Sequence, residues 1–266
     1  MRSIGVWSVK GGVGKTTVCA GLALALRDRG LRVGVLDLDV CGSNIPTALG
    51  LDEQRAEVDT ARQVLLPVRE KGLEVFSVSM VLGKGALLWA GGGAAGLPGT
   101  GRYDLVAQIL RDVAFSPDLD YLLMDIPPGS GDEALALWDN LPDLWGILVV
   151  CQPTALALED LRRTLEAVEA KRLPLLGAVV NMAYAPCPRC GERVVPWHDA
   201  ADAEGFCRAA GVPLLGSLPL AQGRDALAPH FAALAAAVLA AQPQRPKREV
   251  GWALLKAFLR VAMRER

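Results

Sequence analysis

A glycine-rich segment near the start of the chain has the residue types that bind phosphate. Residues 9–17 have the sequence VKGGVGKTT; they follow a short apolar run at 4–8 and open a helix-like stretch at 16–29. Glycines let the backbone wrap a phosphate closely, and the N-terminus of the following helix adds a favourable dipole. The segment therefore predicts a phosphate-binding loop whose members are Gly11, Gly12, Val13, Gly14, Lys15, Thr16 and Thr17.

Two side chains of this loop have separate expected roles. Lys15 would reach the β- and γ-phosphate oxygens, and the Thr16 hydroxyl would ligate Mg²⁺. Guanine-specific loop proteins typically carry an Asn/Thr-Lys-x-Asp stretch, which this sequence lacks. We therefore expect the nucleotide to be ATP.

Acidic residues at the ends of apolar runs could complete the nucleotide centre. Asp125 lies near the end of a run at 121–126, and Asp37 ends a second run at 32–37. Mg²⁺ takes oxygen ligands and usually keeps several waters, so an aspartate near it often acts through water. We assign this role to Asp125, with a strand-end cap as the alternative. Gly129, in the turn that follows, is expected to sense the γ-phosphate.

Cys187 and Cys190 form a second chemical motif, in the sequence APCPRCGE. Two cysteines three positions apart, in a turn made by proline and glycine, point both sulfurs at one metal. One pair supplies two of four ligands, so either two chains share the metal or residues such as His198 and Cys207 join. Four thiolates across a dimer favour an iron–sulfur cluster, whereas cysteines with a histidine favour zinc. A redox-active dithiol is the third alternative.

The elements that must position these residues alternate along the chain. The expected strands are at 4–8, 32–37, 73–78, 121–126, 146–151, 176–181 and 214–217, and the expected helices at 16–29, 104–113, 156–171, 200–210 and 229–241. Strands that are apolar on both faces and alternate with helices indicate a parallel sheet covered on both sides. We predict an α/β P-loop NTPase fold, with a mostly parallel twisted sheet and helices on both faces.

Composition excludes several other classes of protein. The 266 residues include 28 Lys+Arg and 29 Asp+Glu, and 52% are hydrophobic. The apolar share is too high for a disordered protein, and the balanced charge argues against a protein dominated by nucleic-acid binding. The longest apolar stretch, 226–241, is shorter than the roughly 20 residues of a membrane span, and no apolar leader precedes the glycine loop. We expect a cytoplasmic protein with reduced cysteines.

The loop KGGVGKTT resembles the deviant Walker A loop of the ParA, MinD and Mrp group of ATPases. The segments VLDLDVCGSNIPTALGL, LDYLLMDIPPGSGDE, QPTALALEDLRRTLEAVE, LGAVVNMAYAPCPRCGE and PLLGSLPL extend the likeness. Over residues 2–240 the chain is similar to the Mrp/ApbC-type iron–sulfur carrier ATPases, with MDIPPGSGD and CPRC as the most specific segments. The resemblance implies an ATP-dependent homodimer that binds a labile 4Fe–4S cluster through Cys187 and Cys190 and passes it to apo-proteins.

The same resemblance implies roles for four further residues. Lys10 would cross the dimer interface to the partner's nucleotide, where a cation supplied in trans can raise the rate roughly 10³–10⁵-fold when it is an arginine. Asp39 would lie in switch I and orient the attacking water, and Asp37 would support the Mg²⁺ shell. Asn181 would contact the adenine. The alternatives are a solvated loop lysine for Lys10 and strand-end caps for Asp37 and Asn181.

The chain ends in a segment that the resemblance does not cover. We expect an ATPase domain at 1–241, a linker at 242–248 and a C-terminal amphipathic helix at 249–266. Residues 245–266 hold seven Lys+Arg against two Glu, and a basic amphipathic helix can lie on an anionic membrane. Docking on the domain itself or on a partner protein are the alternatives. The alternative function is a MinD/ParA-like positioning ATPase with a structural zinc, or no metal, at the cysteine pair.

Overall fold

The core of the molecule is one eight-stranded sheet. The computed structural model describes residues 1–40, 42–82, 89–90, 93–94, 101–129, 131–141, 143–221 and 223–245. The strands, in sheet order, are β14 (Leu214–Ser217), β11 (Leu175–Val180), β10 (Gly146–Cys151), β1 (Arg2–Trp7), β9 (Tyr121–Asp125), β2 (Val33–Asp37), β6 (Leu73–Ser77) and β5 (Val68–Glu70). All neighbouring strands run parallel except β5 and β6. The predicted mostly parallel sheet is therefore confirmed.

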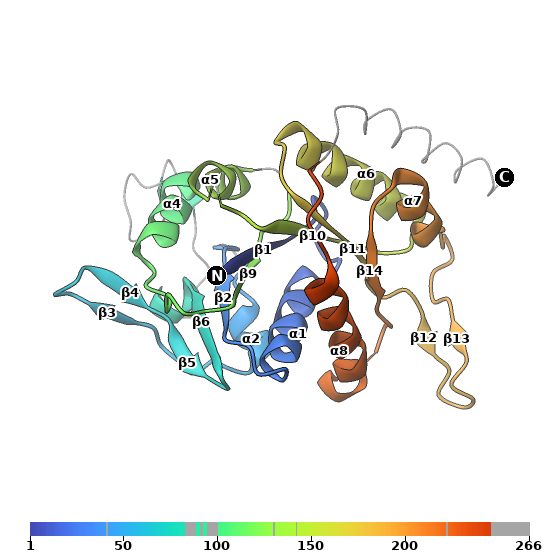
Figure 1. Cartoon of the computed structure of the whole chain (residues 1–266), viewed down its shortest axis with the longest axis horizontal. Helices are drawn as coiled ribbons and strands as arrows, with labels where there is room; N and C mark the ends of the chain where they lie inside the picture. Colours follow the sequence, from blue (N-terminus) through green and yellow to red (C-terminus); the bar gives the residue numbers. More distant parts are fainter. Residues whose placement is uncertain are drawn as a thin grey trace.

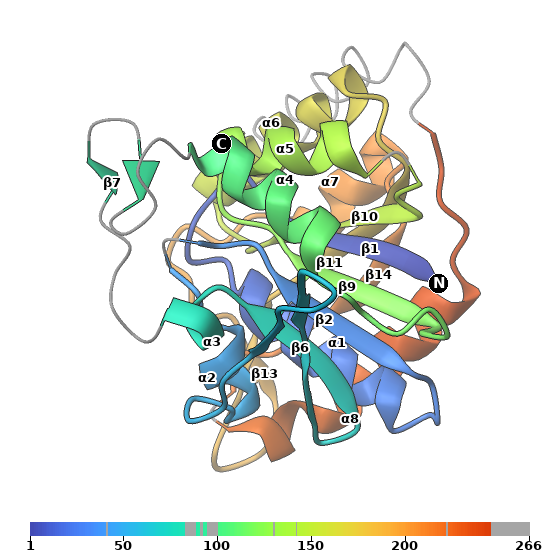
Figure 2. The same cartoon turned by 90° about the vertical axis from the view of Figure 1, so that its left-hand side faces the viewer.

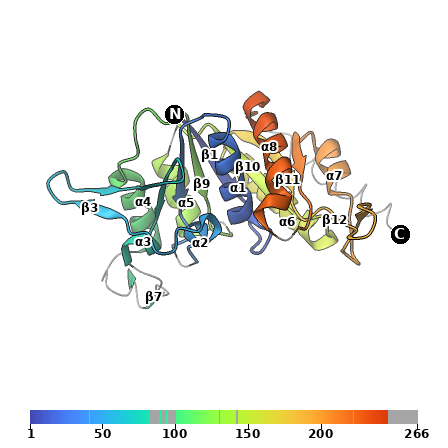
Figure 3. The same cartoon turned by 90° about the horizontal axis from the view of Figure 1, so that it is seen from below.

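Helices cover both faces of this sheet (Figure 1). On one face lie α1 (Lys15–Arg27), α2 (Ile45–Leu49) and α8 (Arg224–Ala240). On the other face lie α4 (Arg102–Asp112), α5 (Asp132–Asn140), α6 (Ala155–Ala170) and α7 (Ala203–Ala210). Figure 2 shows α4 and α5 side by side on that second face, and Figure 3 shows both layers from below. The short helix α3 (Ser79–Leu82) follows β6.

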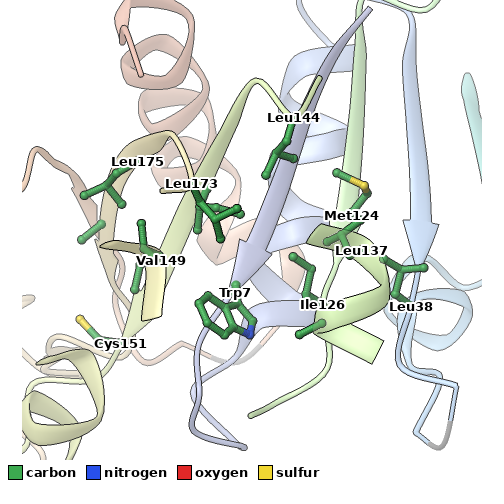
Figure 4. Close-up of a cluster of buried hydrophobic side chains, with 14 of the residues drawn as sticks. Trp7, Leu38, Met124, Ile126, Leu137, Leu144, Val149, Cys151, Leu173 and Leu175 are labelled. Atoms are coloured by element: carbon green, nitrogen blue, oxygen red, sulfur yellow. The ribbon is translucent and has the colours of Figure 1, made fainter. Parts of the chain in front are cut away.

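The sheet separates two apolar cores, one under each layer of helices. The strands β9, β10 and β11 are buried at every position, which agrees with their apolar sequences, broken only by Asp125 at the end of β9. In the core beneath α4 to α7, Trp7 lies close to Ile126 and Leu137 (Figure 4). Because helices cover both faces, the strands are held in place in the sheet. The loops that follow their carboxyl ends therefore start from fixed positions.

Several small elements were not predicted. They are the helices α2, α3 and α5, the edge strand β5, and the hairpins β3 (Glu57–Asp59) with β4 (Val64–Leu66), β7 (Trp89–Ala90) with β8 (Gly93–Ala94), and β12 (Ala185–Pro186) with β13 (Arg193–Val194). The hairpins β3–β4 and β12–β13 project at opposite ends of the molecule (Figure 1). Of these two hairpins, only β12–β13 carries candidate site residues, Cys187 and Cys190.

The predicted tail lies mostly outside the described residues. The expected helix at 249–266 is wholly outside them, as are residues 246–248 of the expected linker. The first part of that linker is joined to the sheet, because Gln244 and Leu175 exchange two backbone hydrogen bonds of 2.7 and 2.8 Å. Among the described residues, no helix combines the length and the apolar content that crossing a bilayer requires.

The contact between α1 and α8 yields a first testable prediction. A Cβ atom at Gly21 would lie 2.3 Å from two ring carbons of Phe231. Alanine in place of glycine inside a helix normally stabilises by roughly 0.5–1 kcal/mol, but overpacking a core costs roughly 1–3 kcal/mol. We expect Gly21→Ala to lower the free energy of unfolding by about 1–2 kcal/mol in denaturant titrations.

The same change in a chain with a smaller residue at position 231 separates the gain in helix stability from the cost of overpacking. In a Phe231→Leu chain the smaller side chain leaves room for the added methyl group, so the same Gly21→Ala change should become neutral or stabilising. A Gly21→Ala chain that is more stable than wild type would contradict the packing seen here.

Candidate functional site

The carboxyl ends of four neighbouring strands surround the glycine-rich loop. This loop connects β1, in the middle of the sheet, to α1. The strands next to it end at or just before Asp37, Asp125, Gln152 and Asn181. In open α/β sheets, ligands bind in the crevice outside the carboxyl ends of the strands. The fold therefore gathers the selected polar residues at one edge, although they are far apart in the sequence.

The loop has the backbone form that a phosphate cradle needs. Gly12 and Gly14 have φ angles of 77° and 88°, in the left-handed region that favours glycine. Helix α1 begins directly after Gly14, at Lys15. The N-terminal N–H groups of α1 are therefore available to an anion.

Asp125 and Thr16 form the best-defined polar contact at the site. The Thr16 hydroxyl donates to Asp125 Oδ2 over 2.6 Å, while Asp125 Oδ1 is buried without a hydrogen-bond partner among the described residues. Burial raises the pKa of Asp125 to about 6, although the hydrogen bond from Thr16 and the charge of Lys15 lower it. A buried carboxylate oxygen without a partner is costly unless a ligand or its water shell meets it. The pair fits a Mg²⁺ ion of the kind that keeps several waters.

The two aspartates at the end of β2, Asp37 and Asp39, are held in different ways. Asp37 lies directly across from Asp125 on the neighbouring strand and is fully buried. Its two carboxylate oxygens accept the backbone N–H groups of Asp39, over 3.1 Å, and Ile45, over 3.3 Å. Burial, and then the charge of Asp125, raises the pKa of Asp37 well above its usual value. Asp39 instead accepts the N–H of Gly42 over 2.9 Å, which closes a turn around its side chain.

Lys15 is buried at the same place. Its ammonium donates to the carbonyl oxygen of Lys10 over 3.2 Å. Burial lowers the pKa of Lys15, and the charges of Asp125 and Asp39 act in the opposite direction. An ammonium held over the loop in this way is in place to meet phosphate oxygens, as the sequence predicts for Lys15.

Lys10 points to a different part of the molecule. Its ammonium lies 3.8 Å from Asp160 on α6, and 27% of the side chain is exposed. The same helix also holds the backbone of the loop, since Thr164 Oγ1 accepts the N–H of Val9 over 3.2 Å. Helix α6 therefore fixes the start of the loop and pairs with its first lysine.

Gly129, which the sequence analysis expects to sense the γ-phosphate, has a left-handed conformation with φ at 91°. Its carbonyl oxygen accepts the indole N–H of Trp7 over 3.0 Å. Trp7 is buried and packs edge-on against Trp138 of α5, with ring centroids 5.4 Å apart. Trp7, the last residue of β1, thus holds the backbone of the turn that follows β9.

Asn181 lies under the loop. It is 5% exposed, and its side-chain amide donates to the carbonyl of Val13 over 2.9 Å. A second amide, that of Gln152, lies 3.4 Å from the carbonyl of Gly12. The predicted adenine contact of Asn181 stays a prediction, since the structure defines only its bond to the loop.

Gln152, Thr164 and Trp7 are site residues that the sequence analysis missed. Gln152 could have been found, because it follows a buried strand as Asn181 does, and polar residues at parallel strand ends face the ligand crevice. Thr164 lies inside a helix and Trp7 inside a strand, where their residue types suit ordinary packing. Their contacts with the loop and with the turn that follows β9 arise only from the tertiary fold.

The cysteine pair lies in the turn of the β12–β13 hairpin. The N–H of Gly191 donates to the carbonyl of Cys187, and that of Cys187 to the carbonyl of Glu192, each over 2.8 Å. Cys190 is exposed and Cys187 is half-buried. The backbone N–H groups of Arg189 and Cys190, then the Cys190 side chain, hydrogen-bond to the Cys187 thiol and lower its pKa. The lowered pKa makes the Cys187 thiol easier to deprotonate, and soft metals bind the deprotonated form of cysteine.

Other predicted ligands do not join this pair. His198 has a side chain 97% exposed, and Cys207 is fully buried in the core beneath α7, where burial raises its pKa to about 12. Within the described part of the chain, no group of three or more His, Cys, Asp or Glu residues could hold a metal ion. One chain therefore offers two thiols at this hairpin, and the structure does not bring His198 and Cys207 to them.

Comparisons with known proteins show the family of this chain. The family model described as NUBPL iron-transfer P-loop NTPase, within the ParA group, matches residues 1–244. The iron-sulfur cluster carrier protein of Aquifex aeolicus is 36% identical over 222 residues, which cover 82% of this chain and 57% of that protein. The human cytosolic Fe-S cluster assembly factor NUBP2 is 38% identical over 220 residues, covering 81% and 78% of the two chains. This chain therefore spans little more than half of the Aquifex carrier.

Solved structures share the fold. A nucleotide-binding protein of Archaeoglobus fulgidus in complex with ADP superposes with a TM-score of 0.66 at 30% identity, covering 88% of this chain and 87% of that one. The cell division ATPase MinD of Pyrococcus furiosus has a TM-score of 0.59 at 22% identity, covering 90% and 98%. The second likeness concerns the fold alone.

Proposed function

The chain belongs to the NUBPL iron-transfer P-loop NTPase family, and on that premise we propose that it is an ATP-hydrolysing carrier of iron–sulfur clusters. Two copies would form a homodimer, bind a labile 4Fe–4S cluster between their Cys187 and Cys190 pairs, and pass it to apo-proteins in the cytoplasm. The observation that carries the proposal is the exposed two-thiol turn on the same chain as a formed phosphate loop.

The number of ligands supports a cluster shared by two chains. Each chain presents two thiols on a projecting hairpin, and its described residues supply no third metal ligand there. An iron–sulfur cluster of this type needs four cysteine ligands, which two such hairpins provide together. Exposure at the surface also suits a cluster that must be handed on, because a buried cluster would have no path to an acceptor.

The nucleotide chemistry follows from the side chains around the loop. Thr16 and Asp125 would hold Mg²⁺, which neutralises charge on the phosphate oxygens when bound. Lys15 would bind the β- and γ-phosphates. Asp39 would orient the attacking water, and Lys10 would act on the partner's nucleotide.

Hydrolysis gives the carrier two states. A dimer closed on ATP would place its two hairpins differently from an open dimer, and loss of the γ-phosphate contact at Gly129 would favour opening. Cluster binding and release would then depend on the nucleotide that is bound, because a ligand shifts a conformational equilibrium by its differential affinity for the two states.

Replacing both hairpin cysteines by serine should remove the cluster. We expect wild-type protein purified anaerobically to carry about two irons and two acid-labile sulfides per chain, with broad absorption at about 400 nm. Cys187→Ser/Cys190→Ser protein should lose at least about nine-tenths of both, because serine is a poor ligand for iron in such clusters. Iron, sulfide, zinc and the visible spectrum are measured on the same samples.

A matched control changes the same turn and leaves both thiols in place. Arg189→Ala protein should retain wild-type iron and sulfide. Colourless wild-type protein with zinc at the hairpin, and failed reconstitution with iron and sulfide, would refute the carrier function. A nucleotide-driven positioning ATPase would then be the better hypothesis.

A further inference from the structure

Two amide side chains hold the phosphate loop by its carbonyl groups. Gln152 Nε2 lies 3.4 Å from the oxygen of Gly12, and Asn181 Nδ2 lies 2.9 Å from that of Val13. A peptide group is planar and trans, so each carbonyl points opposite to the N–H of the next residue. The two amides therefore set the directions of the Val13 and Gly14 N–H groups, which belong to the expected phosphate cradle.

Met182 lies between these amides and the cysteine hairpin. Its φ of 56° is in the left-handed region, which a side chain other than glycine rarely adopts and which costs about 1–3 kcal/mol. Its sulfur lies 3.1 Å from Gln152 Nε2, and a Cβ atom at Gly14 would lie 3.7 Å from its terminal methyl group. The strained residue therefore contacts the loop side of the site directly.

The other side of Met182 is attached to the segment that leaves the hairpin. Its carbonyl oxygen accepts the indole N–H of Trp197 over 2.8 Å. The chain enters the hairpin from Met182 through Tyr184, and Arg193 on the returning strand stacks on the Tyr184 ring at 4.3 Å. Met182 thus stands just before the hairpin in the chain and is also bonded to the segment that follows it, while the Arg193–Tyr184 contact joins the two strands of the hairpin to each other.

We propose that Met182 couples the phosphate loop to the cysteine hairpin, through Gln152 and Asn181 on one side and Trp197 on the other. The inference rests on the proposed function, since it concerns how the nucleotide regulates the cluster site. Phosphate that accepts the Val13 and Gly14 N–H groups fixes the opposite carbonyls, and these fix Gln152 and Asn181. Met182 is then held in its left-handed conformation, and the Trp197 bond transmits that restraint to the hairpin.

Thiol alkylation in the presence of MgADP tests this coupling. MgADP fills the part of the loop that binds the α- and β-phosphates and lacks the γ-phosphate that would close a dimer. We expect MgADP to slow iodoacetamide labelling of the half-buried Cys187 about fivefold, the low end of measured coupling between sites. The protein is apo, reduced and anaerobic, and labelling is read at Cys187 by peptide mass spectrometry.

Removing one donor atom should abolish the effect. Trp197→Phe keeps the ring but lacks the N–H, so MgADP should change its Cys187 labelling by less than about twofold. Trp145→Phe is the matched control, because Trp145 is also a half-buried tryptophan but packs against Tyr121 and the N-terminal strand. It should show the wild-type fivefold slowing.

A second variant tests the same coupling if the Trp197→Phe chain does not fold. Met182→Leu keeps the size and backbone strain but lacks the sulfur near Gln152, and it should also lose the nucleotide effect. Equal slowing in wild type, Trp197→Phe and Met182→Leu would overturn the coupling, as would no slowing in a wild-type chain that calorimetry shows to bind MgADP. A wild-type chain that does not bind MgADP would instead refute the nucleotide part of the proposed function.

Discussion

A Lys10→Ala chain is expected to hydrolyse ATP at least about 10³-fold more slowly than wild type, while binding ATP with an affinity within about threefold. Lys15 already occupies the phosphate side of the loop, where its ammonium donates to the Lys10 carbonyl. The Lys10 ammonium is directed to Asp160 on α6 instead. Its removal should therefore spare nucleotide binding within one chain and reduce kcat, which is measured by phosphate release at saturating ATP.

Mixing two inactive variants tests whether Lys10 acts across the dimer. In a dimer of one Lys10→Ala chain and one Asp39→Ala chain, the nucleotide on the first chain meets an intact Asp39 and the partner's intact lysine. Random mixing should then restore about a quarter of wild-type activity, because half of the dimers are mixed and each has one complete site. If Lys10 acts within its own chain, no mixture regains activity. Lys171→Ala, at an exposed lysine after α6, is the matched control and should keep wild-type kcat.

An Asp125→Asn chain is expected to be more stable than wild type without nucleotide, and to lose the stabilisation that Mg²⁺–ATP gives. The pKa of Asp125 is about 6 in the folded chain and 3.8 in its ordinary state. The folded state therefore holds the proton more tightly, and the free energy of unfolding falls as the pH rises from about 4 to 6. Above that window the buried charge costs up to about 3 kcal/mol.

The net gain from this change is smaller than the full cost of the charge. Lys15 loses a neighbouring carboxylate that favours its charged form, so we expect a rise in Tm of about 3–6 °C at pH 7.5 and little change near pH 4.5. Thermal unfolding at both pH values, with and without Mg²⁺–ATP, measures it. An Asp125→Asn chain with a lower Tm than wild type at pH 7.5 would show that the carboxylate stabilises the resting fold.

The sequence predicted those parts of the fold that depend on local pattern. Strands β10 and β14 have the predicted bounds, and β1, β2, β6, β9 and β11 lie within two residues of theirs, because each is a short apolar run between polar turns. The glycine loop could be predicted for the same reason. Gly12 and Gly14 have left-handed backbone conformations that the turn of the loop itself requires, so the loop can be recognised from its own residues. Helix α5 was missed, although Asp132 and Glu133 in its first turn are a recognisable helix start.

The contacts that hold the site could not be predicted from the same sequence. Asn181 is separated from Val13 by 168 positions, and Trp7 from Gly129 by 122. Such pairs depend on the order of strands in the sheet, which the alternation of strands and helices does not fix. The edge strand β5 shows the same limit, because its antiparallel pairing with β6 comes from a short connection that the α/β pattern does not require.

The position of β1 in the middle of the sheet has a consequence for synthesis on the ribosome. This strand is translated before the other strands of the sheet, but its two neighbours are β9 and β10, so that Arg2 pairs with Tyr121 and Ile4 with Gly146. At about 5–20 residues per second, the glycine loop would wait roughly 7–30 s for the strands that flank it. During that interval an apolar strand without a partner is exposed to aggregation, and chaperones that bind nascent chains would act on this strand before its neighbours are made.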